Sequence, residues 1–136
     1  MAASRRWLAR IAFALVLAVV LVSVLLPNTD LAWMREHWAW FNRPMLWIEQ
    51  ANSRVNLVHL VLFLLLGMAA RAAIPGWNAG RMAAALLLLG IATELLQIVV
   101  PGRDPRIADV VVDIVAGMAG WAFAHVVARC LAAARG

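Results

Sequence analysis

Four long apolar runs alternate with shorter, more polar segments along the chain. The runs cover about residues 7–26, 55–73, 82–100 and 107–127. An α-helix rises 1.5 Å per residue and the hydrocarbon core of a bilayer is about 30 Å thick, so about 20 apolar residues cross it. Segments that contain proline follow the first three runs and end each helix. The pattern therefore predicts an all-α fold, one domain over residues 1–136 with four transmembrane helices.

The segment between the first two runs predicts an interfacial amphipathic helix over about residues 31–48, broken near Pro44. Its apolar side chains recur at spacings of three and four, as one face of a helix requires: Leu31, Met34, Trp38, Phe41 and Met45. The segment also holds four of the seven tryptophans, Trp33, Trp38, Trp40 and Trp47, and tryptophan favours the headgroup region of a membrane. The helix is either a connector that rests on the membrane or a lid that gates a site beneath it.

Composition supports a membrane environment and excludes several other classes of protein. Hydrophobic residues make up 65% of the chain and the mean hydropathy is +0.87, far from a soluble domain. The net charge of +5 comes from scattered arginines without a basic face, so nucleic-acid binding is not expected. The single cysteine, Cys130, forms no intrachain disulfide, and no Cys/His grouping has the spacing of a zinc site. We therefore assign no metal ligands from the sequence and leave any cofactor open.

The first run follows Arg5 and Arg6, as in a signal peptide, but its length and the lack of a small-residue cleavage site favour a retained helix. Four crossings place both termini on one side of the membrane. Seven arginines lie on that side and five on the other, a bias that favours cytoplasmic termini and outward-facing loops at 27–54 and 101–106.

Polar residues interrupt the second, third and fourth runs, where ionisable groups cost several kcal/mol unless they are paired or hydrated. They are Asn56 and His59, then Thr93, Glu94 and Gln97, then Asp109 and Asp113. The alternating direction of the helices brings His59, Glu94 and Asp113 to a similar depth near one membrane face. The sequence therefore predicts a polar centre built from three helices.

Spacing places these residues on particular helix faces. Glu94 and Gln97 share one face, as do Asp109, Asp113 and Gly117. Gly117 and Gly120 remove side-chain bulk and let the fourth helix approach its neighbours closely. The loop after the third run places Arg103 over the cluster, where its guanidinium would neutralise a carboxylate or clamp an anionic headgroup.

Together these residues form the pattern Glu94-x-x-Gln97-x-x-x-Pro101-Gly102-Arg103 and Asp109-x-x-x-Asp113-x-x-x-Gly117, preceded by His59-x-x-x-Phe63. The pattern resembles the VanZ-like family of bacterial membrane proteins over about residues 55–121. The resemblance implies an integral protein of the bacterial cytoplasmic membrane with a polar centre. It also implies a link to the cell envelope, because the family is named for a protein linked to resistance to the glycopeptide teicoplanin. A basic residue is common in the family at the position of Asn56, and asparagine at that of Asp113.

Three functions are compatible with this cluster. The first is a structural network that fixes helix register. The second is an enzyme for a lipid-linked or cell-envelope substrate. In it His59, Glu94 and Asp113 are the catalytic candidates, with His59 or Glu94 as the general base. Asp109 and Asp113 would orient His59 or bind a divalent cation with Glu94.

Substrate binding would fall to four residues, Asn56, Gln97, Arg103 and Asp109. The third function is binding or transport of a lipid, drug or cation without covalent change. Four helices are few for a transport pathway in one monomer, so this function implies a homo-oligomer with Gly117 and Gly120 as candidate contacts.

Overall fold

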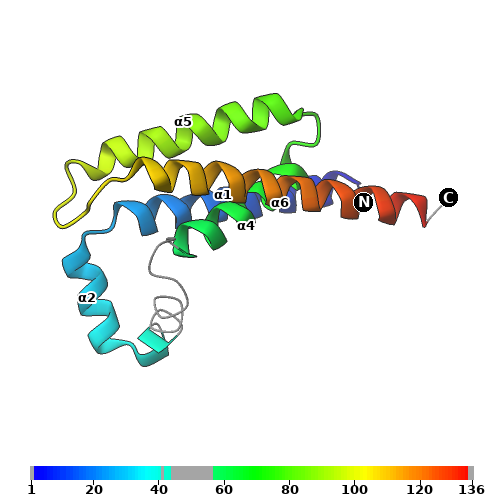
Figure 1. Ribbon diagram of the computed structural model, residues 1–136. Helices are drawn as coiled ribbons and strands as arrows, with labels where there is room; N and C mark the ends of the chain where they lie inside the picture. Colours follow the sequence, from blue (N-terminus) through cyan, green and yellow to red (C-terminus); the bar gives the residue numbers. More distant parts are fainter. Residues whose placement is uncertain (1, 41, 44–56, 135–136) are drawn as a thin grey trace.

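The computed structural model describes residues 2–40, 42–43 and 57–134, and all regular structure within them is helical. The helices are α1 (Ala2–Leu25), α2 (Asn28–His37), α4 (Leu57–Ala73), α5 (Ala79–Gln97) and α6 (Ile107–Ala133). Figure 1 shows α1, α4, α5 and α6 lying along one another as an elongated bundle, with α2 projecting from one end. The all-α prediction is therefore confirmed for this part of the chain.

Three of these helices are long and apolar enough to cross a membrane, over Arg6–Leu25, Ala79–Gln97 and Ile107–Ala133. The fourth apolar helix, α4, has 17 described residues and is shorter than the other three. The predicted residues 55 and 56 of this span lie outside the described residues. Within the described residues the structure thus supports a membrane protein with three helices long enough to cross a bilayer and one shorter apolar helix, and the fourth crossing stays a prediction.

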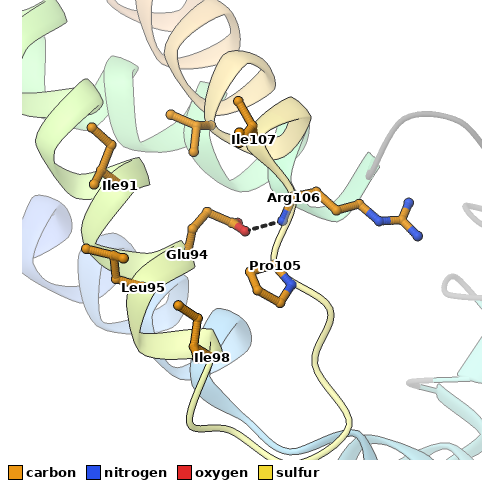
Figure 2. A pocket seen from close by; sticks show the side chains of 8 residues that line it. Ile91, Glu94, Leu95, Ile98, Pro105, Arg106 and Ile107 are labelled. Carbon is orange, nitrogen blue, oxygen red and sulfur yellow. Dashed lines mark hydrogen bonds between the residues drawn. The ribbon is translucent and has the colours of Figure 1, made fainter.

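The bounds of α5 differ from the predicted run of 82–100 because polar and turn residues set both ends. Asn78 caps the start, where its side-chain oxygen accepts the main-chain N–H of Arg81 at 2.9 Å. After Gln97 the chain tightens into turns, with the N–H of Val100 donating to the carbonyl of Gln97, and Gly102 takes a φ of 76° that favours glycine. Figure 2 shows how this loop leads through Pro105 and Arg106 into α6.

Helix α2 confirms that the segment after α1 is helical, with different bounds. It begins at Asn28 and ends at His37, because Trp38 has extended backbone angles. Trp33 and Trp40 are 53% and 72% exposed, as expected of rings in a headgroup layer. Residues 44–48 of the predicted helix, with its break at Pro44, lie outside the described residues. Helix α2 packs on no other described helix, so it does not act as a closed lid in this structure.

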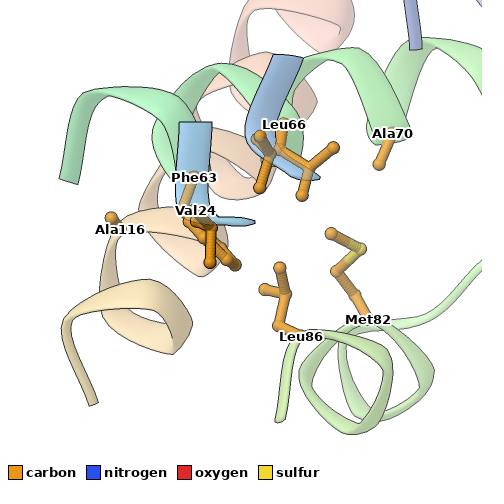
Figure 3. Close-up of a cluster of buried hydrophobic side chains, with 8 residues drawn as sticks. Val24, Phe63, Leu66, Ala70, Met82, Leu86 and Ala116 are labelled. Atoms are coloured by element: carbon orange, nitrogen blue, oxygen red, sulfur yellow. The ribbon is translucent and has the colours of Figure 1, made fainter. Parts of the chain in front are cut away.

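Apolar side chains from four helices meet in one core along the bundle. Its buried members are Val20, Val24, Phe63, Leu66, Ala70, Met82, Leu86 and Ala116. Figure 3 shows Val24, Phe63 and Leu86 converging from α1, α4 and α5. Large apolar side chains such as Leu88 and Val99 remain exposed on the outside of the bundle, as expected of a surface that contacts lipid.

Glycines on α4 and α6 allow these two helices to approach closely. A Cβ atom at Gly120 would overlap the carbonyl oxygen of Leu64, and one at Gly67 would overlap that of Gly117. The prediction that Gly117 and Gly120 serve close packing is therefore confirmed. Both are buried against other helices of the same chain, and the predicted homo-oligomer stays a prediction.

The order of the helices places the polar residues at one end of the bundle and the termini at the other (Figure 1). Helices α1 and α5 end where α4 and α6 begin. Residues near the start of α4, the end of α5 and the start of α6 therefore share one end, and the predicted polar residues occupy these positions.

Candidate functional site

His59 and Asp113 form a buried pair between α4 and α6. The Nδ1 atom of His59 lies 2.9 Å from Oδ1 of Asp113, and the two residues are 4% and 0% exposed. The imidazole also stacks on Phe63, one turn along α4, with 6.1 Å between ring centroids. Because the carboxylate holds Nδ1, acid–base or ligand chemistry at this ring would take place at Nε2.

Glu94 on α5 is held by the main chain at the start of α6. Its Oε2 accepts the N–H of Arg106 at 2.5 Å, the contact drawn in Figure 2. Arg106 is the N-cap residue of α6, so the carboxylate also lies at the positive end of the helix dipole. Only 8% of Glu94 is exposed. This contact fixes a buried carboxylate at the junction of α5 and α6.

Asp109 joins His59 and Glu94 in a compact group that draws on three helices. Each of the three offers a possible ligand atom, and these atoms all lie within 4.8 Å of one another. Asp109 is in the first turn of α6, one turn before Asp113, so both carboxylates share a face of that helix. The predicted convergence of His59, Glu94 and Asp113 is thus confirmed, and their chemical roles remain predictions.

Two carboxylate oxygens in this cluster are buried without a hydrogen-bond partner in the described structure: Oε1 of Glu94 and Oδ2 of Asp113. A buried polar atom left without a partner costs about 1–3 kcal/mol, and more when it carries charge. Native proteins keep few such atoms, and those they keep have a specific cause, such as a catalytic role or a bound water or ion. The cluster therefore has unused capacity to bind a donor or a cation.

Gln97 and Arg103 bind the end of α1 rather than the cluster. Nε2 of Gln97 donates to the carbonyl of Val24 at 3.1 Å. Nε and Nη2 of Arg103 donate to the carbonyls of Leu26 and Ser23 at 3.0 and 2.6 Å. These carbonyls lack partners within the helix, and a cation there also complements the helix dipole. Arg103 forms no ion pair with a described carboxylate, so the structure does not show the neutralising role, and the alternative of binding an anionic headgroup stays a prediction.

The remaining predicted polar residues contribute less to the geometry. The hydroxyl group of Thr93 donates to the carbonyls of Leu89 and Gly90 within its own helix. Asn56, a predicted substrate-binding residue, lies outside the described residues. Burial lowers the pKa of the Arg103 guanidinium. The group stays cationic at neutral pH, because the ordinary pKa of an arginine side chain is far above 7.

A pocket of about 240 Å³ opens between the end of α5 and the start of α6. It is lined by Ile91, Glu94, Leu95, Ile98, Pro105, Arg106, Ile107 and Val110. Figure 2 shows the carboxylate of Glu94 between the apolar side chains of α5 and the loop that carries Pro105. The walls are thus mostly apolar, and the carboxylate of Glu94 lies among them, whereas the guanidinium of Arg106 points away from that carboxylate (Figure 2).

Sequence reasoning identified the side chains of the cluster and missed the pocket and the role of Arg106. Glu94 binds a main-chain N–H of Arg106, and any residue except proline supplies that group. The only available signal was the position of Arg106 at the start of a predicted helix, where main-chain N–H groups lack partners.

Comparison with known proteins gives one family match. The family described as VanZ/LLP1 matches residues 11–128. No curated protein and no solved structure matches the chain.

Proposed function

The chain belongs to the VanZ/LLP1 family, and we propose that it binds a lipid-linked, cell-envelope substrate at the polar cluster of His59, Glu94, Asp109 and Asp113. The substrate would enter from the membrane through the pocket between α5 and α6. The observation that carries this proposal is the pocket itself, because its apolar walls lead to the buried carboxylate of Glu94. An amphiphile with a hydrocarbon chain and a polar headgroup matches both features.

The proposal places the protein in the bacterial cytoplasmic membrane with four crossings. The 17 residues of α4 extend about 25 Å, which is short of a bilayer core by an amount that local thinning accommodates. Four crossings also agree with the two termini lying at one end of the bundle. By the arginine bias, that end faces the cytoplasm and the cluster faces outward.

Arg106 is the residue we propose for the headgroup. It borders the pocket, and its exposed side chain pairs among the described residues only with Asp104, at 3.5 Å. The guanidinium points away from Glu94 (Figure 2), so it would turn towards the pocket to bind a headgroup. Exposed ion pairs of this kind contribute about 0–1 kcal/mol, so an anionic headgroup would compete with Asp104 at little cost. Arg103, which the sequence favoured, already binds the end of α1.

His59 is the proposed general base, acting through Nε2 while Asp113 orients the ring. A buried carboxylate on the other ring nitrogen is the arrangement that fixes the tautomer of a catalytic histidine and stabilises its protonated form. The alternative is binding or transport without chemistry, for which the same pocket suffices. The hydrogen bonds from the side chains of Gln97 and Arg103 to carbonyls at the end of α1 support the other alternative, a purely structural network.

Binding of a polyprenyl phosphate to the purified protein in nanodiscs tests the proposal. Ile91→Trp would fill the pocket and weaken binding at least about tenfold, which corresponds to 1.4 kcal/mol. Leu88→Trp is the matched control, because Leu88 is exposed one turn earlier on α5 and does not line the pocket. Equal binding by the two variants, or equal binding of the neutral polyprenol, would contradict the proposal.

Chemistry and binding are separated by following the bound lipid with mass spectrometry. If His59 is the base, the parent converts the lipid and His59→Gln binds it without conversion. If the parent binds the lipid and never converts it, the protein is a binding or transport component. The proposed envelope role, including a contribution to teicoplanin resistance, is checked by the susceptibility of cells that express the parent or Ile91→Trp at equal abundance.

A further inference from the structure

We propose that His59, Glu94 and Asp109 bind a divalent transition-metal ion such as Mn²⁺ or Zn²⁺. The proposal goes beyond lipid binding and does not depend on it, because the three side chains form a donor set of their own. While an ion is bound, Nε2 of His59 is a ligand and does not act as a general base. They come from α4, α5 and α6, so a bound ion would also join the three helices at the end of the bundle.

The geometry of the three donors fits one ion. Their candidate ligand atoms all lie within 4.8 Å of one another. Donors at about 2.0–2.2 Å from a common ion in a tetrahedral site are about 3.3–3.6 Å apart, so the three atoms would approach one another by up to about 1.5 Å, a movement that side-chain rotation supplies. Two of the donors, His59 and Glu94, are buried, and Asp109 is half-buried. Burial removes competition from water for the ion.

A second observation, buried carboxylate oxygens without a partner, points to a cation as the ligand of this cluster. Glu94 is 8% exposed, and its Oε1 has no hydrogen-bond partner although Oε2 is bound by Arg106. Oδ2 of the fully buried Asp113 has none either. Several carboxylates gathered in a buried place repel one another and lose their hydration, and a divalent cation removes both costs.

The environment of His59 is the one that metal-binding histidines have. Its Nδ1 is held by the carboxylate of Asp113 at 2.9 Å, which directs Nε2 as the ligand atom. Such a carboxylate–histidine pair orients the ring and raises its basicity towards a metal. Asp113 is therefore a positioning residue, and His59, Glu94 and Asp109 are the ligands.

The donor set indicates the class of ion and its use. One imidazole and two carboxylates suit Mn²⁺ or Zn²⁺ better than Ca²⁺ or Mg²⁺, which take oxygen ligands alone. Three protein ligands leave coordination positions open for water or a substrate oxygen. Because Glu94 also lines the pocket, the ion would lie beside the pocket. Its positive charge would attract a phosphate headgroup, which carboxylates alone would repel.

Metal binding by the purified protein, carrying no histidine tag and stripped with EDTA, tests the inference without any lipid. Equilibrium dialysis against Mn²⁺ or Zn²⁺ should give about one ion per chain. Asp109→Asn and His59→Gln should each weaken binding at least about tenfold, because even an outer residue of a metal site contributes 10–100-fold. Asp104→Asn is the matched control, since Asp104 is an exposed acid just before the same helix.

The result that overturns the inference is a parent protein that binds neither ion, or an Asp109→Asn variant that binds as the parent does. Equal loss in Asp104→Asn would also overturn it. Size-exclusion chromatography shows whether each variant folds. If His59→Gln does not fold, the metal affinity of Asp109→Asn alone tests the inference. Because the probe is the metal alone, failure here leaves the pocket experiment with Ile91→Trp unaffected, and failure of that experiment leaves metal binding standing.

Discussion

The Nδ1 atom of His59 lies 2.9 Å from Oδ1 of Asp113, although the two residues are 54 positions apart in the chain. The contact joins α4 to α6 where close glycine packing already holds those helices together. A fully buried aspartate stabilises the imidazole in one orientation and retains an oxygen without a partner. The pair is therefore both a helix contact and the part of the cluster that sets the direction of the histidine.

Substitutions of Asp113 separate these two roles. Asp113→Asn keeps an oxygen that accepts from Nδ1, so we expect normal abundance and a melting temperature close to that of the parent. Asp113→Ala leaves the buried Nδ1 without a partner and should destabilise the protein by about 1–3 kcal/mol. Thermal unfolding in detergent measures both. If Asp113→Ala is as stable as Asp113→Asn, the hydrogen bond does not hold the helices.

The contact between α4 and α6 depends on glycine at position 120. Gly120→Ala would place a Cβ against the carbonyl of Leu64, and the backbone must move to admit it. We expect a loss of about 1–3 kcal/mol, the usual cost of overpacking. Gly80→Ala is the matched control, because a Cβ there meets only Asn78 at an ordinary 3.6 Å. That variant should be neutral or more stable by up to about 1 kcal/mol; similar losses in both would refute the packing account.

Two neighbouring arginines should have opposite phenotypes. Arg103→Ala removes two hydrogen bonds to the end of α1, so we expect a loss of stability of about 1.5–3 kcal/mol. Arg106→Ala removes an exposed side chain, should change stability by about 0.5 kcal/mol or less, and should weaken polyprenyl phosphate binding.

Unfolding and lipid binding, measured on the same preparations, check this pair of expectations. Lys at position 103 is a useful intermediate, because Arg103→Lys keeps the charge beside α1 and loses the two-pronged geometry. If Arg103→Ala keeps full stability and loses lipid binding, the sequence-based role of Arg103 at the headgroup is correct and our assignment to Arg106 is wrong.

Sequence periodicity was sufficient to predict the all-α fold and the convergence of His59, Glu94 and Asp113, because helix rise and alternating direction fix depth in a membrane. It was also sufficient for the role of Gly120, since small residues mark close helix contacts. It did not predict the hydrogen bonds from Arg103 to the end of α1, because a long side chain in a short loop reaches several partners and the sequence does not select among them. It could not find the Glu94 contact, which uses the main chain of Arg106, or the pocket, which arises from packing.

The central claim is that the buried polar cluster is a working site rather than a scaffold. The melting temperature of Glu94→Gln, measured in EDTA beside the parent, tests it most directly. Glutamine keeps an oxygen for the N–H of Arg106 and removes a buried charge whose other oxygen has no partner. Our account predicts that Glu94→Gln melts at or above the temperature of the parent. Melting well below it would mean that the carboxylate holds the fold together, and the cluster would then be a scaffold.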